Sequence, residues 1–181
     1  MTLSADSVGE RIAGLLAYPE TEYRERIEAA REALAGEPAA ARHHLAEFAS
    51  AVRNLSTEQL QELFTRTFDL NPVCVLEVGW QLYGDEYKRG EFLMKMQQSL
   101  AQHGLLSSSE LPDHLTRVLP LLDCLPPEEG RALTCEFLVP AVRKMVAGIE
   151  GKQNPFEHVL KAVSEVLEGR TARVSREVCH D

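Results

Sequence analysis

The amino-acid sequence predicts an all-α protein, a single-domain bundle of about eight or nine helices over residues 1–169. Apolar residues recur three and four positions apart in almost every segment of the 181-residue chain, which is the spacing of an amphipathic helix. Residues 73–82 alone have strand-like composition, and no second strand candidate exists to pair with them. No linker-like segment and no repeat of fixed period divides the chain, so one core is expected.

The first four helices have recognisable starts and stops. Ser7 followed by Glu10, and Ser56 followed by Gln59, match the capping box that opens a helix. Pro19 is expected to stop the first helix and Gly36 to end the second. The four apolar stripes are Val8, Ile12, Leu15 and Leu16; Tyr23, Ile27, Ala30 and Leu34; Leu45, Phe48, Ala49 and Val52; and Leu60, Leu63, Phe64 and Thr67.

The middle of the chain contains the one ambiguous segment. Residues 73–82 are partly β-branched, but Asn71-Pro72 is a good helix start, so we interpret the segment as a short buried helix. An amphipathic helix follows between Gly84 and Gly104, with Phe92, Leu93, Met96 and Leu100 on one face and Lys88, Glu91, Lys95, Gln98 and Gln102 opposite. After a loop over 105–110, a short helix carries Leu115, Val118, Leu119 and Leu122 and is expected to bend at Pro120.

The last third of the chain predicts two helices. The first begins at Pro126-Pro127 and should kink at Pro140; its inner face is Leu138, Ala141, Val142, Met145 and Ile149. The second begins at Asn154-Pro155 and is expected to end at Gly169; its stripe is Phe156, Val159, Leu160, Val163, Val166 and Leu167. Residues 170–181 carry no stripe and are expected to form a disordered tail.

Composition narrows the class of protein. The formal net charge of −9 disfavours nucleic-acid binding, which depends on basic patches, and favours a basic partner such as a positively charged peptide. No apolar run approaches the ~20 residues of a membrane span, and residues 1–10 lack the features of a signal peptide. Cys74, Cys124, Cys135 and Cys179 form no C-x-x-C pair and are interpreted as reduced thiols. A cytoplasmic protein is therefore expected.

The usual signatures of enzymes and metal sites are missing. Gly79 and Gly84 have the spacing of a phosphate loop, but Asp85 follows where the lysine belongs. There is no G-x-S-x-G elbow and no Glu-x-x-His repeat, and His43-His44 has no acidic or thiol cluster at ligand spacing. We therefore predict no catalytic residues, no metal and no cofactor. A nucleotide-hydrolysing or metal-binding enzyme and a purely structural or regulatory helical module remain the rival classes.

Two segments are unusual for a plain helical bundle. Residues 68–90, FDLNPVCVLEVGWQLYGDEYKRG, contain the only tryptophan and two of the four tyrosines; they also read as an inter-helix turn with a buried aromatic anchor. Residues 110–114, ELPDH, also read as a helix start in which Asp113 caps a helix that begins near His114.

These segments resemble the NarJ/TorD family of assembly chaperones for molybdenum-cofactor oxidoreductases, in its nitrate-reductase delta-subunit-like branch. ELPDHL resembles the family's E-x-P-D-H-L signature, and LFTRTFDLNPVCVLEVGWQLYGDEYKRG, residues 63–90, resembles the region upstream of it. The early Leu-Leu-Ala-Tyr-Pro, which ends in Tyr18 and Pro19, is similar to the family's start. The resemblance extends over about residues 8–168.

The resemblance implies a TorD-like all-helical fold without catalysis of its own, and a chaperone that binds the apo catalytic subunit of a molybdoenzyme of the dimethyl sulfoxide reductase superfamily. The bound segment would be a twin-arginine-type leader or N-terminal peptide, held until cofactor insertion and before export or assembly. The alternative is a helical subunit retained in the mature complex. A monomer is expected, with a dimer left open.

The family's peptide-binding residues would correspond to Asp113 and His114, with Pro112 beside them in the signature. Further candidates are Leu63, Phe64, Trp80, Tyr83 and Tyr87 for the apolar part of the peptide and Asp69, Glu77, Asp85, Glu86 and Asp113 for its arginines. An acidic protein with an aromatic-lined groove would complement both halves of such a leader.

Overall fold

The computed structural model describes residues 7–105 and 108–177, with only the backbone of 173–177. All regular elements in these ranges are helical, apart from one isolated antiparallel bridge between Glu77 and His114. The α-helices are α1 (Val8–Ala13), α2 (Tyr23–Ala33), α3 (Ala39–Val52), α4 (Thr57–Phe64), α5 (Val78–Tyr83), α6 (Tyr87–Gln102), α7 (Leu115–Leu122), α8 (Pro127–Leu133), α9 (Val139–Ile149) and α10 (Phe156–Glu177). A 3₁₀ turn, η1 (Leu34–Gly36), and two π-helical turns, η2 (Thr65–Asp69) and η3 (Thr134–Leu138), complete them. The predicted all-α class is confirmed. Counting α8, η3 and α9 as one continuous run leaves nine helices in the described ranges, within the predicted number.

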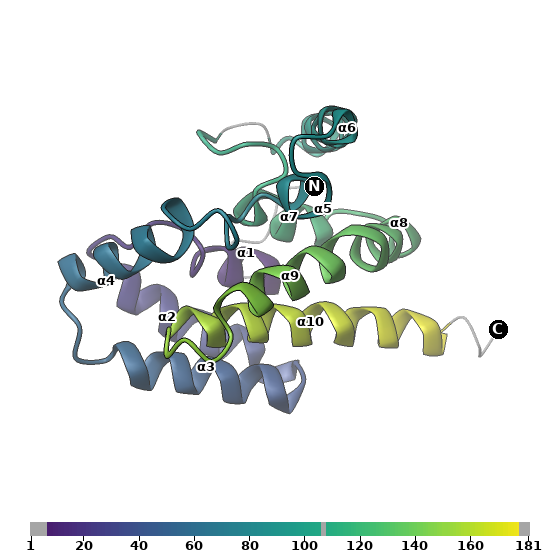
Figure 1. Ribbon diagram of the computed structural model, residues 1–181. Helices are drawn as coiled ribbons and strands as arrows, with labels where there is room; N and C mark the ends of the chain where they lie inside the picture. The colour runs from purple at the N-terminus through teal and green to yellow at the C-terminus, as the bar shows by residue number, and fades with distance from the viewer. Residues whose placement is uncertain (1–6, 106–107, 178–181) are drawn as a thin grey trace.

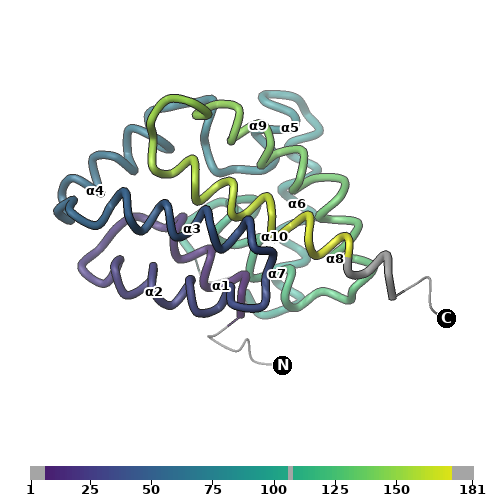
Figure 2. The backbone as a smooth tube through the Cα atoms, turned by 90° about the horizontal axis from the view of Figure 1, so that it is seen from below, coloured from purple at the N-terminus to yellow at the C-terminus, as the bar shows by residue number. Residues whose placement is uncertain are grey.

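The core is organised around α10. This helix lies alongside α3 and next to α9, as Figures 1 and 2 show from two directions. Phe156, at the start of α10, is completely buried and touches the rings of Phe48, Phe64 and Phe68, with ring centroids 5.3, 5.7 and 5.0 Å away. One aromatic cluster therefore joins α3, α4, η2 and α10, and aromatic pairs at these separations add to the stability that burial supplies.

Three of the predicted helix starts have side-chain caps in the structure. Ser7 Oγ accepts a hydrogen bond from the Glu10 amide at 3.2 Å. Ser56 and Gln59 form a complete capping box: Ser56 Oγ accepts from the Gln59 amide, and Gln59 Oε1 accepts from the Ser56 amide. Asn154 Oδ1 accepts from the Phe156 amide at 3.0 Å and so caps α10. These local bonds satisfy amides that a helix start leaves without partners.

Two expectations about helix boundaries are wrong. Residues 72–77 are irregular, and α5 begins only at Val78, because the Val78 amide donates to the Asp113 carbonyl at 3.0 Å instead of to a preceding turn. α10 continues through Gly169 to Glu177: Gly169 does not have the positive φ of a helix stop, and Arg170 is held by an ion pair with Asp123. The remaining part of the expected disordered tail, residues 178–181, lies outside the described residues.

The helix is interrupted just before Pro140, at the place where a kink is expected. Pro140 has no amide hydrogen to donate to the carbonyl four residues earlier, and the π turn η3 ends directly before α9, in which Pro140 is the second residue. The kink itself stays a prediction.

Candidate functional site

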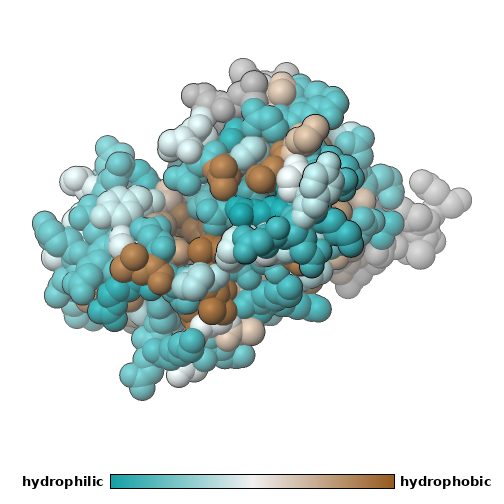
Figure 3. All heavy atoms as spheres, turned by 45° about the horizontal axis from the view of Figure 1, so that its top comes forward, coloured by the Kyte–Doolittle hydropathy of each residue, from teal (hydrophilic) through white to brown (hydrophobic). Residues whose placement is uncertain are grey.

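A cleft of about 490 Å³ lies where three distant segments of the chain meet. Its walls come from the residues that follow α1, from the end of α4 through the irregular segment before α5, and from the loop that leads into α7. The lining residues are Leu16, Ala17, Tyr18, Phe64, Phe68, Asp69, Val75, Leu76, Glu77, Glu110, His114 and Thr116. Figure 3, with the top of Figure 1 turned forward, shows hydrophobic side chains set back among hydrophilic ones on one face of the molecule.

The apolar part of the cleft is aromatic. The Tyr18 ring, 48% exposed, meets Phe64 edge to face with a centroid separation of 5.6 Å, and Phe64 packs on Phe68 at 4.9 Å. The π turn η2 contributes Phe68 and Asp69 side by side, since its wider turn inserts one more residue than an α-helix would. Asn154 Nδ2 donates to Thr67 Oγ1 at 2.8 Å, which fastens this turn to the start of α10.

The polar part of the cleft is acidic. Asp69, Glu77 and Glu110 contribute three carboxyl groups, and none of the lining residues is a lysine or an arginine. The Nε2 atom of His114 lies 3.9 Å from Glu110 Oε2. Burial lowers the pKa of His114 below its ordinary value, and the carboxylates of Glu77 and Asp69 offset only part of this effect. At neutral pH, His114 is therefore uncharged and the cleft is negative.

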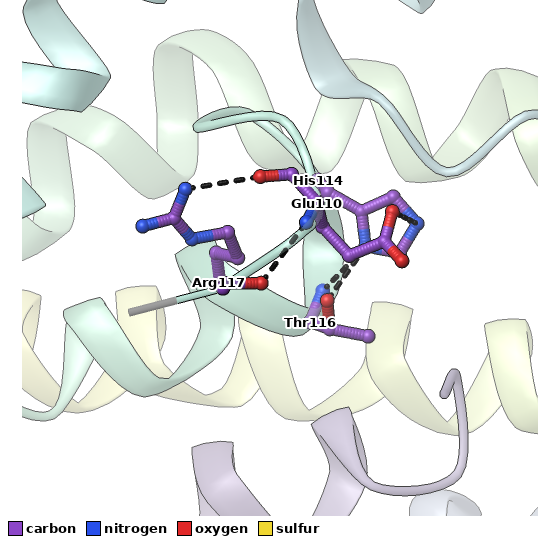
Figure 4. A network of polar contacts seen from close by, with 5 residues as sticks. Glu110, His114, Thr116 and Arg117 are labelled. Carbon is purple, nitrogen blue, oxygen red and sulfur yellow. Dashed lines mark hydrogen bonds and ion pairs between the residues drawn. The ribbon is translucent and has the colours of Figure 1, made fainter. Parts of the chain in front are cut away.

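His114, and not Asp113, caps α7. His114 Nδ1 accepts from the Thr116 amide at 3.3 Å and lies 2.6 Å from the Thr116 hydroxyl, as Figure 4 shows. An unprotonated Nδ1 is required for this cap, so the neutral ring carries its proton on Nε2, the atom that faces Glu110.

The expected capping role of Asp113 is thus wrong, for a tertiary reason. Its side chain is 0% exposed and points away from α7: Asp113 Oδ2 accepts from the Gly79 amide of α5 at 2.8 Å, 34 residues away in sequence. Burial raises the pKa of this carboxyl, while the Gly79 amide and the charge of Arg89 act in the opposite direction.

Arg117 is a structural residue of this site that sequence reasoning missed. Its guanidinium group is nearly buried and donates to the backbone carbonyl of Glu110 at 3.1 Å (Figure 4). It also donates to the carbonyl of Leu105 at 2.8 Å and so holds both ends of the loop before α7. The sequence signal that could have identified Arg117 is that it is the lone charged residue in the apolar stretch LTRVLPLL. Sequence reasoning also did not assign Phe68, Glu110 or Thr116 to the site.

Of the residues predicted to bind a peptide, the structure brings Phe64, Glu77 and His114 into the cleft, together with Asp69. Trp80 and Tyr83 lie elsewhere. Trp80 Nε1 donates to the Pro72 carbonyl at 3.2 Å and its ring lies under the Arg89 guanidinium at 5.1 Å, while the Tyr83 ring packs near Phe92.

The other predicted residues also lie outside the cleft. Tyr87, 85% exposed, and Pro112 line a separate surface hollow along α6. Leu63 packs against the core, and Asp85 and Glu86 are exposed in the turn between α5 and α6. Within residues 7–105 and 108–177, no group of three or more histidine, cysteine, aspartate or glutamate side chains is arranged to hold a metal ion. In the same ranges, no helix is long and apolar enough to cross a bilayer.

Fold and cleft together define the class: an all-helical protein with an acid-rimmed aromatic cleft. A family model described as nitrate reductase delta subunit matches residues 31–148, about two thirds of the chain. The chain therefore belongs to this family, within the NarJ/TorD group that its motifs resemble.

Named relatives agree with the family. The chain is 29% identical over 123 residues to the nitrate reductase molybdenum cofactor assembly chaperone NarJ of Escherichia coli K12; the match covers 66% of this chain and 52%, about half, of that protein. It is 27% identical over 167 residues to a Bacillus subtilis protein named as a NarJ chaperone, covering 90% of this chain and 89% of the relative. A crystal structure described as a redox enzyme maturation protein from Archaeoglobus fulgidus has a similar fold, with a TM-score of 0.63 at 19% identity, covering 93% of this chain and 96% of that one.

Proposed function

We propose that this chain is an assembly chaperone, not an enzyme, and that its cleft binds an N-terminal peptide of the apo catalytic subunit of a molybdoenzyme of the dimethyl sulfoxide reductase superfamily. One observation carries the proposal. The three segments that resemble the family, which include Tyr18, Phe64 and His114, are far apart in sequence and line the same cleft. The relatives, which are named as nitrate reductase assembly chaperones, support the role of an assembly chaperone.

The chemistry of the cleft suits a basic and apolar peptide. Three carboxyl groups without a lysine or arginine among them favour a guanidinium or ammonium group, and the neutral His114 adds no opposing charge. The rings of Tyr18 and Phe64 can cover an apolar side chain beside it. The net charge of −9 would also speed the approach of a cationic leader. Because the resemblance implies binding before export, we propose that the protein acts in the cytoplasm.

Calorimetry with the N-terminal peptide of the molybdoenzyme encoded beside this chain tests the proposal. We expect a Kd in the micromolar range or tighter, roughly −8 kcal/mol. Glu77→Gln and Asp69→Asn should each raise the Kd about two- to fivefold and weaken its salt dependence. The matched controls are Asp85→Asn and Glu86→Gln, which remove equal charge from exposed positions outside the cleft and should leave the Kd nearly unchanged.

Two outcomes would contradict the proposal. Absence of binding at tens of micromolar wild-type protein would exclude this peptide as the ligand. An equal effect of cleft and control variants would show that only the net charge matters. Purification from cells separates the chaperone from the retained-subunit alternative: the chaperone accompanies the apo catalytic subunit and is absent from the active holoenzyme.

A further inference from the structure

We propose that Asp113 is a positioning residue of the cleft: it does not touch the ligand, and it holds Glu77 and His114 in place by binding the Gly79 amide of α5. This inference rests on the proposed function of the cleft. It gives Asp113 a structural role in place of the expected pairing with an arginine of the client peptide. The carboxyl group is completely buried, and Asp113 is not among the residues that line the cleft.

The hydrogen bonds around Asp113 connect two walls of the cleft. Its side chain accepts from the Gly79 amide and its backbone carbonyl accepts from the Val78 amide, while the Leu115 amide donates to the Leu76 carbonyl at 3.0 Å. These bonds flank the isolated bridge between Glu77 and His114. The two cleft residues are therefore held opposite each other by bonds that run behind them, away from any ligand.

Asp113 also replaces a missing local cap. Glu77, at the start of α5, makes no side-chain capping bond, so the N-terminal amides of this short helix depend on Asp113. The contact requires a glycine: a Cβ atom at Gly79 would lie 2.7 Å from Asp113 Oδ2 and 3.1 Å from the Phe92 ring. The other oxygen, Asp113 Oδ1, is also buried and has no hydrogen-bond partner among the described residues, so a ligand in the cleft does not reach either oxygen without movement of the surrounding side chains.

The chain contains a second copy of this arrangement that serves as a control. Asp123 Oδ2 accepts from the Gly9 amide of α1 at 3.0 Å, and a Cβ atom at Gly9 would lie 2.4 Å from that oxygen. Neither Gly9 nor Asp123 lines the cleft. Asp123 Oδ1 in addition pairs with Arg170 of α10, so Asp123→Ala removes this ion pair together with the tertiary cap of α1. It does not touch the wall formed by Glu77 and His114.

The experiment compares Asp113→Ala, Asp113→Asn and Gly79→Ala with the control Asp123→Ala, in the full chain and well below the lowest melting temperature. Asn keeps a capping oxygen but has no charge, and Gly79→Ala displaces the carboxyl while leaving its charge intact. We expect Asp113→Ala and Gly79→Ala to raise the Kd for the client peptide about tenfold or more, while Asp113→Asn and Asp123→Ala stay within about threefold of wild type. If Asp113→Asn binds as weakly as Asp113→Ala, or if Gly79→Ala binds like wild type, the positioning role is overturned.

A ligand-free measurement keeps this test separate from the proposed function. In NMR titrations of the free protein, the depressed pKa of His114 should return toward its ordinary value in Asp113→Ala and Gly79→Ala, because the ring loses its burial, and should stay depressed in Asp113→Asn and Asp123→Ala. An unchanged His114 titration in Asp113→Ala overturns the inference even if no peptide binds. Absence of peptide binding by wild type together with the expected shifts overturns only the proposed ligand.

Discussion

At the scale of single residues, the cleft depends on polar atoms whose partners come from another part of the chain. Asp113 and His114 are neighbours, yet one carboxyl reaches back to α5 and one imidazole caps α7. Because a capping imidazole must accept a hydrogen bond, its protonation state becomes part of the stability of the fold.

His114 should make the protein less stable in mild acid. Its folded-state pKa lies below the ordinary value of 6.5, so between these values the unfolded chain binds more protons, and the free energy of unfolding falls as the pH drops below about 6.5. His114→Asn keeps a capping group that does not titrate. In urea unfolding, the free energy of unfolding should fall less between about pH 8 and about pH 6 for this variant than for wild type. The comparison with wild type is needed because burial also lowers the pKa of His44. His44 therefore lowers the stability in acid by the same amount in both proteins. Equal losses would exclude the capping role of His114.

At the scale of secondary-structure elements, irregular turns place the side chains that line the cleft. The π turn η2 supplies Phe68 and Asp69 to the cleft, and the break before α5 supplies Glu77. Between α5 and α6 the chain reverses at Gly84, which has φ 54° and ψ −125°, a conformation that residues with a side chain rarely adopt. The position of α6 therefore depends on one glycine.

Two glycines of this region should respond to alanine with opposite signs. Gly84→Ala should lower the free energy of unfolding by about 1–3 kcal/mol, since the strain of its positive φ has no compensating contact. Gly90, inside α6 and exposed with open space around it, should tolerate the change, and Gly90→Ala should raise stability by about 0.5–1 kcal/mol through helix propensity. Urea denaturation of the two variants measures both effects. A stabilising Gly84→Ala would show that the turn does not have this conformation.

At the scale of the whole molecule, one aromatic cluster supports both the core and the cleft. Phe156 contacts Phe64 and Phe68, and these two rings form the inner wall of the cleft. The start of α10 is thus the point at which the long helix α10 and the cleft are connected.

Phe156→Ala should lower the free energy of unfolding by about 3–5 kcal/mol, because it removes a completely buried ring and leaves a cavity. Met94→Ala, at a side chain that is 75% exposed on α6, should change it by less than about 0.5 kcal/mol. Urea unfolding of both variants provides the measurement. A Phe156→Ala effect as small as that of Met94→Ala would mean that the aromatic cluster does not form.

The sequence by itself determined the helical class and the caps at Ser7, Ser56 and Asn154. These features follow from periodicity and short-range hydrogen bonding, which neighbouring residues specify. The three segments that line the cleft stood out in the sequence only by their resemblance to the motifs of the family. Only the tertiary structure decided which candidates share a site: it brought Tyr18, Phe64, Glu77 and His114 together and placed Trp80, Tyr83 and Tyr87 elsewhere. It also gave the cap of α7 to His114 instead of Asp113, because the amide that Asp113 satisfies lies 34 residues away. A distant partner of this kind leaves no periodic signal in the chain, since its position depends on how the helices pack.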